Sequence, residues 1–236
     1  MEVIHSLQTT IAGHSFALYQ TTKRPVPLVI EIAFYGQPAE FFRLCTRAGC
    51  PAFNLLCVGN QSWDEDLSPW PEHPCVEPDD RFTGQAPQFL KVLSEEVLPW
   101  VHSQLPAAPT YTLLAGYSMG GLFSLWAGTQ SAAFDAYVSA SGSVWYPGFL
   151  DYALHHPFVK KPLAIYLSLG SKEIQVRNPL LQTTGQVFEE LLKHYQSEGI
   201  PATFVWNQGN HFVDALGRLA RGVYWTMEEI RHKEEE

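Results

Sequence analysis

The sequence has few cysteines, few cations and no long hydrophobic run. Its 236 residues include four cysteines, with no CxxC pair and no histidine at zinc-ligand spacing. We therefore interpret the cysteines as reduced, mostly buried thiols, with a disulfide or a metal as the alternative. No cluster of lysines and arginines occurs, so a nucleic-acid partner is not expected. The apolar run 27–30, for example, ends at Glu31, so its length is far short of the ~20 residues that span a membrane.

Apolar residues make up 46% of the chain and aromatic residues 13%, which excludes general disorder. The length suits one large domain, and no repeat or change in composition suggests a boundary, so 1–236 is predicted to be a single domain. The net charge of -9 predicts solubility. The first six residues lack the basic and apolar regions of a secretory signal, so we expect a cytoplasmic protein. The sequence leaves open whether the protein forms a homodimer.

Short apolar runs alternate with amphipathic helical patterns along most of the chain. The runs are 28–34, 53–58, 112–115, 136–140, 163–169 and 202–206. Runs that are apolar on both faces are typical of a parallel sheet covered on both sides. Helical periodicity covers 89–101, with a kink expected at Pro99, and also 187–195 and 216–230. Stretches 2–10 and 14–21 predict an antiparallel hairpin at one edge, so the predicted fold is α/β, a mostly parallel central sheet with helices on both faces and an antiparallel N-terminal edge.

Two long stretches, 60–84 and 141–162, fit neither pattern and are rich in aromatic residues. Long connections in compact domains are usually functional, so we expect both stretches to line a site. Trp63, Trp70 and Trp145 are the candidate substrate contacts in them. The alternative is that these aromatic side chains belong to the domain core.

The clearest motif is Gly116-Tyr117-Ser118-Met119-Gly120, a G-x-S-x-G sequence between an apolar run and a helical pattern. Such a strand-to-helix turn exposes the serine at the edge of the sheet, and Ser118 is the predicted nucleophile. The amide of Met119, at the start of the helix, is predicted to stabilise an oxyanion. Tyr117 is a further candidate substrate contact. The alternative is a structural glycine-rich turn.

A serine needs a base to become a nucleophile, and His211 is the candidate among nine histidines because it closely follows the run 202–206. Glu173, just past the run 163–169, is the predicted acid that orients it. The chain order Ser118, Glu173, His211 is that of α/β-hydrolases. Asp214 is the competing acid, and a dyad without any acid is the third possibility.

The second oxyanion donor is expected after the run 28–34, at the amides of Tyr35 or Gly36, although these residues could form an ordinary turn. The sequence contains no H-E-x-x-H, G-x-G-x-x-G or EF-hand motif. The glycines from 116 to 121 have P-loop spacing, but Leu122 stands where the lysine must be. No metal or phosphate site is therefore predicted.

Beyond the G-x-S-x-G motif, the segments 63–70, 141–145, 170–173 and 209–212 make the chain similar to the enterochelin esterase and esterase D-like branch of the α/β-hydrolases. The resemblance implies Ser118 as nucleophile, His211 as base and Glu173 as acid, with no cofactor. Members include siderophore trilactone esterases, S-formylglutathione hydrolases and broad carboxylesterases. Members that act on catecholate siderophores are expected to offer cations to the substrate, whereas the segment after the acid has only Arg177, with Lys172 nearby.

The leading hypothesis is a serine carboxylic-ester hydrolase that acts through a Ser-His-Glu triad and an acyl-enzyme. Its expected partner is a small ester, thioester or lactone, with no nucleic acid and no membrane. The alternatives are a siderophore trilactone esterase, an acyltransferase with the same triad, and a non-catalytic binding protein with this fold.

Overall fold

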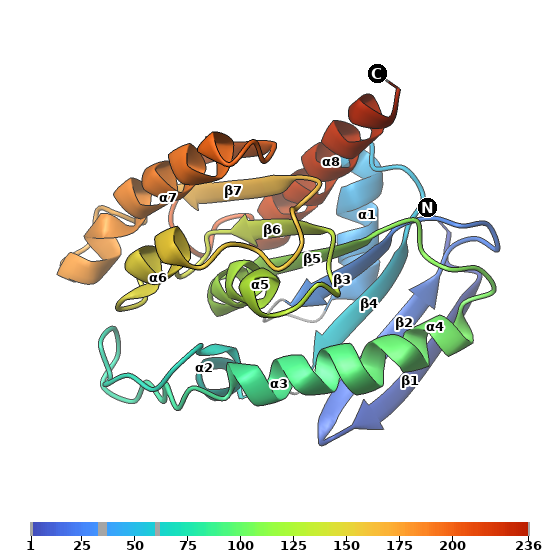
Figure 1. Cartoon of the computed structure of the whole chain (residues 1–236), viewed down its shortest axis with the longest axis horizontal. Helices are drawn as coiled ribbons and strands as arrows, with labels where there is room; N and C mark the ends of the chain where they lie inside the picture. Colours follow the sequence, from blue (N-terminus) through green and yellow to red (C-terminus); the bar gives the residue numbers. More distant parts are fainter. Residues whose placement is uncertain (1, 33–36, 60–61, 236) are drawn as a thin grey trace.

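The computed structural model describes residues 2–32, 37–59 and 62–235. Its centre is an eight-stranded sheet in the order β1-β2-β4-β3-β5-β6-β7-β8 (Figure 1). Strand β2 pairs antiparallel with β1 and β4, and all other pairings are parallel. The mostly parallel sheet with an antiparallel N-terminal edge is therefore confirmed. The strands are β1 His5–Ile11, β2 His14–Gln20, β3 Leu28–Ile32, β4 Asn54–Gly59, β5 Thr112–Tyr117, β6 Ala136–Ala140, β7 Ile165–Gly170 and β8 Ala202–Asn207.

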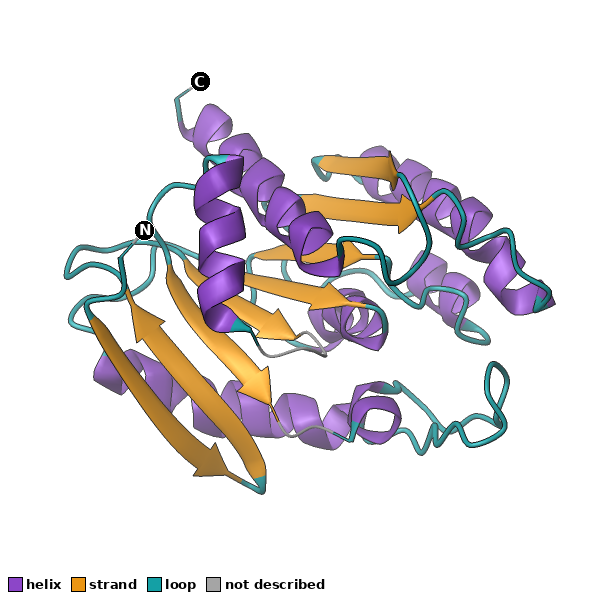
Figure 2. Cartoon of the chain, turned by 180° about the vertical axis from the view of Figure 1, so that it is seen from behind, coloured by secondary structure: helices purple, strands orange, loops and turns teal. Residues whose placement is uncertain are grey.

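Helices cover both faces of the sheet, as Figure 2 shows from behind. Helices α1 and α8 pack together on one face, and their buried side chains form one hydrophobic cluster with that face. Buried side chains of α3, α5 and α7 belong to the cluster on the other face. The helices are α1 Pro38–Ala48, α2 Trp63–Leu67, α3 Ala86–Val92, α4 Leu98–Gln104, α5 Met119–Gln130, α6 Phe149–His155, α7 Pro179–Ser197 and α8 Ala215–Glu234.

The helical pattern around Pro99 forms one long element with a π turn inside it. Helices α3 and α4 are joined by the π-helical turn Leu93–Val97, and the amide of Leu98 donates to the carbonyl of Leu93. Proline has no amide and its ring crowds the carbonyl four residues earlier, so a regular α-helix is disfavoured here. The π turn just before Pro99 is thus the form that the expected kink takes.

The two irregular stretches each contain a short helix that the sequence pattern did not reveal. Helix α2 lies in 60–84 and α6 lies in 141–162. All four cysteines are free, with Cys45 and Cys57 buried and the other two partly exposed. Among the described residues, no group of three or more histidine, cysteine or acidic side chains could hold a metal ion. No helix in the described part of the chain is both long and apolar enough to cross a membrane.

Glu31 is an acidic side chain in the interior of the sheet. It is 2% exposed, its Oε2 accepts from the Cys57 thiol at 3.0 Å, and its Oε1 has no hydrogen-bond partner among the described residues. Burial raises the pKa of Glu31 from 4.5 to about 7, and the Cys57 hydrogen bond offsets only part of this effect. Glu31 therefore keeps its proton in the folded protein over a pH range in which the unfolded chain loses it.

We expect Glu31→Gln to remove a pH dependence of stability. Between the unfolded pKa of 4.5 and the folded pKa of about 7, the folded protein binds one proton more than the unfolded chain at this site, so its stability falls as pH rises. The free energy of unfolding of the wild type, relative to Glu31→Gln, should fall by up to about 3 kcal/mol across this range and then level off. Urea titrations of both proteins between pH 4 and 8 measure this, and parallel curves would contradict it.

Candidate active site

Ser118 occupies a strained turn between β5 and α5. Its backbone angles are φ 56 and ψ -124, a left-handed φ that few residues other than glycine adopt. The flanking glycines make room for this turn. A Cβ on Gly116 would lie 1.9 Å from the Gly120 carbonyl oxygen, and one on Gly120 would lie 2.4 Å from the Ile32 carbonyl oxygen. The local sequence therefore fits a tight strand-to-helix turn that presents the serine hydroxyl.

The structure brings Ser118, His211 and Glu173 together in one hydrogen-bonded chain. The loop after β8 carries His211, whose Nε2 lies 3.1 Å from Ser118 Oγ. The turn after β7 carries Glu173, whose Oε2 lies 2.6 Å from His211 Nδ1. Because β5, β7 and β8 are parallel, their carboxyl ends meet at one edge of the sheet. The arrangement has the hydroxyl–imidazole–carboxylate order of a serine hydrolase triad.

Glu173 is held mainly by groups that favour its ionised form. Its Oε1 accepts hydrogen bonds from the Gly170 amide, the Ser141 hydroxyl and Arg218 Nη1 at 2.7–2.8 Å. Burial raises the pKa of Glu173. The hydrogen bond and charge of His211, together with the hydrogen bonds from Ser141 and Gly170, outweigh this effect and leave the pKa below its ordinary value. The side chain is thus a carboxylate at neutral pH and can stabilise a protonated imidazole.

Asp214, the competing acid, points elsewhere. It is 50% exposed and its Oδ2 pairs with Arg221 at 2.8 Å. Met119 is the first residue of α5, so its amide belongs to the turn whose amides have no partner within the helix. Tyr35 and Gly36, the predicted second oxyanion donors, lie outside the described residues.

A cavity of about 400 Å³ opens beside Ser118, His211 and Glu173. Its apolar lining side chains are Val76, Trp145, Val176, Leu181 and Phe212. Lys172 and Glu77 are its other ionisable lining residues. Phe212 is 76% exposed and forms part of the rim. The cavity therefore offers an apolar surface next to the reactive hydroxyl.

The other predicted substrate contacts do not line this cavity. Trp70 packs on Tyr146 and Tyr152 and its indole N–H donates to the Pro147 carbonyl, so it joins the two stretches 60–84 and 141–162 instead. Trp63 is half-buried against the hydrophobic core and Arg177 is exposed. The positions of the two tryptophans follow from packing, because burial in the core stabilises an aromatic side chain as much as contact with a substrate would.

Tyr117 is buried beneath the site and supports the loop that carries His211. Its hydroxyl donates to the His211 carbonyl at 2.5 Å, and burial raises its pKa to about 12. It is thus a neutral hydrogen-bond donor to the backbone of the base and not part of the cavity lining.

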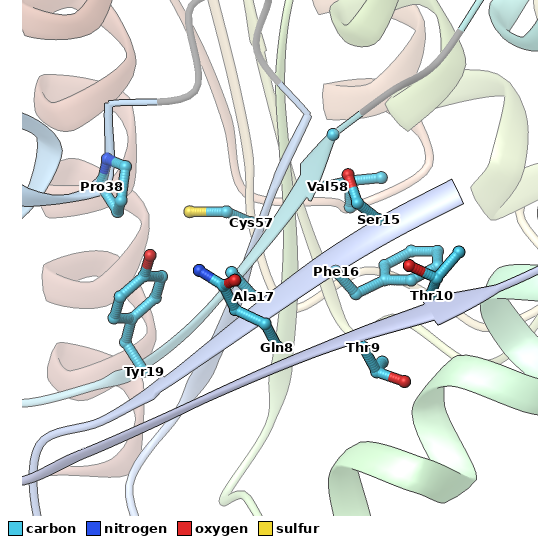
Figure 3. Close-up of a pocket in the computed structure, with 11 residues that line it drawn as sticks. Gln8, Thr9, Thr10, Ser15, Phe16, Ala17, Tyr19, Pro38, Cys57 and Val58 are labelled. Carbon is cyan, nitrogen blue, oxygen red and sulfur yellow. The ribbon is translucent and has the colours of Figure 1, made fainter. Parts of the chain in front are cut away.

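A larger hollow, of about 560 Å³, lies over β1, β2 and β4 (Figure 3). Its lining residues are Gln8, Thr9, Thr10, Ser15, Phe16, Ala17, Tyr19, Pro38, Cys57, Val58 and Gly59. No histidine or carboxylate is among them, and burial raises the pKa of the Cys57 thiol well above its ordinary value. The Cys57 thiol therefore stays protonated at neutral pH, and the hollow lacks the hydroxyl–imidazole–carboxylate arrangement found beside Ser118.

Two buried residues of the site, Arg218 and Ser141, were missed by sequence reasoning. Arg218 stands next to Leu219 and Ala220 in the apolar pattern of the final helix, and a cation at such a position signals a buried partner. Ser141 has φ 45 and directly follows β6. It lies in the segment 141–145 that resembles the family and in the stretch expected to line the site, but no pattern in the sequence gives this serine a role of its own.

Comparison with known proteins identifies the family. Residues 58–201 match the model of the family described as "Putative esterase", a region that includes Ser118 and Glu173. A siderophore enterobactin esterase from Emericella nidulans is 38% identical over 119 residues, which are 47% of this chain and 39% of that protein. The match thus spans well under half of that relative.

Solved structures share the fold at low sequence identity. Siderophore hydrolase EstA from Aspergillus nidulans superposes with a TM-score of 0.72 at 19% identity, covering 95% of this chain and 94% of the other. An IroE-like serine hydrolase from Shewanella oneidensis gives a TM-score of 0.80 at 16% identity, over 95% and 80% of the two chains. An S-formylglutathione hydrolase from Agrobacterium tumefaciens gives 0.64 at 14% identity, over 98% and 100%. The chain therefore belongs to the esterase family, and it has the α/β-hydrolase fold that its sequence predicted.

Proposed function

We propose that the chain hydrolyses carboxylic esters, with Ser118 as nucleophile, His211 as base and Glu173 as the acid that orients it. The observation that carries this proposal is the continuous hydrogen-bonded chain from Ser118 Oγ through His211 to Glu173. These three residues line a cavity that is large enough for a small substrate. Membership in the esterase family supports the same reaction class.

In the proposed acylation step, Ser118 Oγ attacks the ester carbonyl carbon while His211 Nε2 takes the hydroxyl proton. The carbonyl oxygen becomes an oxyanion, which the Met119 amide at the start of α5 stabilises. The tetrahedral intermediate collapses when His211 returns the proton to the departing alkoxide, and an acyl-enzyme is left. Tyr35 and Gly36 stay the predicted source of the second amide.

In deacylation, water occupies the place of the departed alcohol. His211 takes a proton from the water, the resulting hydroxide attacks the acyl carbonyl, and Ser118 recovers its proton as the acid leaves. Glu173 accepts from His211 Nδ1 throughout, which fixes the imidazole tautomer and stabilises the imidazolium formed in both steps. The low pKa of Glu173 keeps this acceptor charged.

The cavity favours a small ester, thioester or lactone with an apolar group. Five of its lining side chains are apolar, among them Trp145 and Leu181, and Lys172 is the one lysine or arginine among the described lining residues. An apolar acyl group would gain from burial against these side chains, whereas a strongly anionic substrate would find little countercharge.

Narrowing the cavity should change the preference for acyl length. We expect Leu181→Trp to lower kcat/KM for p-nitrophenyl hexanoate at least about tenfold more than for the acetate, since each displaced methylene costs about 1–3 kcal/mol in an apolar pocket. The control is Leu154→Trp, because Leu154 is an exposed leucine of α6 that does not line the cavity. Equal losses for both esters, or the same shift in the control, would show that Leu181 does not contact the acyl group.

A siderophore ester is the second candidate substrate. The similarity to the siderophore enterobactin esterase of Emericella nidulans favours it. Parallel assays with enterobactin and with p-nitrophenyl esters of two to eight carbons test both candidates, with released acid measured by chromatography. Hydrolysis of the simple esters with a higher kcat/KM supports the small-ester proposal, and a higher value for enterobactin assigns the siderophore. No hydrolysis of any of them by the folded protein would contradict the proposed ester hydrolysis.

A further inference from the structure

Arg218 is a buried cation behind the triad, outside the cavity. It lies in the first turns of α8, its side chain is 0% exposed, and it is not among the residues that line the cavity at Ser118. A buried guanidinium is costly unless its donors are satisfied. Nη1 and Nη2 together donate four hydrogen bonds of 3.0 Å or shorter, whereas Nε finds no partner in the part of the chain that the structure describes. The partners of Nη1 and Nη2 therefore decide what the residue does.

Nη1 holds the acid of the triad. It donates to Glu173 Oε1 at 2.8 Å and to Ser141 Oγ at 2.9 Å, and the Ser141 hydroxyl in turn donates to the same Oε1. These bonds occupy Oε1 and leave Oε2 directed at His211 Nδ1, 2.6 Å away. The orientation of the Glu173 carboxylate thus depends directly on the guanidinium.

Nη2 holds the loop that carries the base. It donates to the carbonyl of Gln208 at 3.0 Å and to that of Asn210 at 2.9 Å, the second of which directly precedes His211. The loop also contains Gly209 in a left-handed conformation, with φ 96. The same planar group therefore joins the segment after β7 to the segment after β8.

We propose that Arg218 is a positioning residue that sets the distance between Glu173 and the His211 loop, and so keeps His211 Nε2 on Ser118 Oγ. This inference rests on the proposed ester hydrolysis. The guanidinium suits the task because its donors form a rigid planar fork, whereas a lysine ammonium is a single flexible point charge. A misplacement of about 1 Å between catalytic groups can cost about 10²-fold in rate.

The test measures kcat per active site in Arg218→Met and Arg218→Lys, with active sites counted by fluorophosphonate titration so that unfolded molecules do not contribute. We expect kcat per site to fall about 10²-fold in Arg218→Met and at least about tenfold in Arg218→Lys, with KM for a p-nitrophenyl ester changed less than about threefold. The matched control is Arg231→Met, on the same helix, where Arg231 is 47% exposed and pairs with Glu228. Its kcat should stay within about twofold of the wild type.

A double-variant cycle with Glu173→Gln separates positioning from general support of the fold. If Arg218 acts through Glu173, then Arg218→Met should lower kcat per site less than about threefold in the Glu173→Gln background. The double variant removes both buried charges together, so it should be more stable than Arg218→Met alone.

Unchanged kcat per titrated site in both Arg218→Met and Arg218→Lys would overturn the positioning role, and equal losses from Arg218→Met in both backgrounds would overturn the part of it that acts through Glu173. These outcomes leave the proposed function intact as long as Ser118→Ala is inactive. Full turnover by Ser118→Ala would instead reject the proposed function itself.

Discussion

Ser118→Ala should lower kcat for ester hydrolysis by at least about 10⁴-fold, because the substitution removes the hydroxyl that is proposed to attack the carbonyl carbon. The fold should persist, since Ser118 holds the turn through its backbone, whose carbonyl accepts from the amides of Gly121 and Ser143. Initial rates with a p-nitrophenyl ester and thermal melting followed by circular dichroism measure the two effects.

The control for this variant is the same change at Ser197, an exposed serine at the end of α7. Ser197→Ala should keep kcat within about twofold, since surface substitutions change stability by no more than about 0.5 kcal/mol and this one lies away from the cavity. Turnover above about 1% of the wild type in Ser118→Ala would contradict a covalent mechanism at this residue.

Glu173→Gln should lower kcat by about 10³–10⁴-fold, because a glutamine that presents its NH₂ to His211 Nδ1 favours the wrong imidazole tautomer. It should also destabilise the fold. The substitution leaves the guanidinium of Arg218 buried without its carboxylate, which costs about 3–5 kcal/mol. Steady-state rates and urea titrations at pH 7 measure both losses.

The pH dependence of this stabilisation has a definite sign. Because the folded pKa of Glu173 lies below its unfolded value, its contribution to stability is present above the unfolded pKa and is lost as pH falls through the folded pKa. The difference in unfolding free energy between wild type and Glu173→Gln should therefore shrink in acid.

Asp214→Asn is the comparison that decides which residue is the acid. Asp214 pairs with Arg221 at the surface, so its substitution should change kcat less than about threefold. A large loss in Asp214→Asn with an active Glu173→Gln would transfer the role of acid to Asp214.

The sheet could be predicted because its interior strands are buried on both faces. Strands β3, β5, β6 and β7 consist entirely of buried residues, so each appears in the sequence as a short apolar run. The run 136–140 coincides with β6. The antiparallel edge was also predictable, because Ala12 and Gly13, both with positive φ, separate two β-like stretches.

The positions of the triad residues followed from one rule, that parallel strands end at the same edge of a sheet. Ser118, Glu173 and His211 each follow a predicted strand closely, and the structure places the three side chains in hydrogen-bond contact. Helix α6 and the role of Tyr117 could not be predicted in this way. They depend on contacts between segments far apart in the sequence, as when Tyr117 binds the carbonyl of His211.

Composition alone could not predict which aromatic residues line the cavity. Trp145 lines the cavity, whereas Trp70 packs on Tyr146 and Tyr152, although all four side chains lie in stretches with the same aromatic character. The role of Arg218 could not be predicted from the sequence either. Its partner Glu173 is 45 residues away in the chain, so only the fold reveals that the buried cation serves the acid.

Labelling with a fluorophosphonate, followed by peptide mapping by mass spectrometry, shows whether Ser118 is the nucleophile. We expect one phosphonylated residue, Ser118, with labelling abolished in Ser118→Ala and slowed by at least about 10²-fold in His211→Ala, because the serine needs its base. Labelling at a different serine, or no labelling of the folded wild-type protein, would contradict the assignment of Ser118 as the nucleophile.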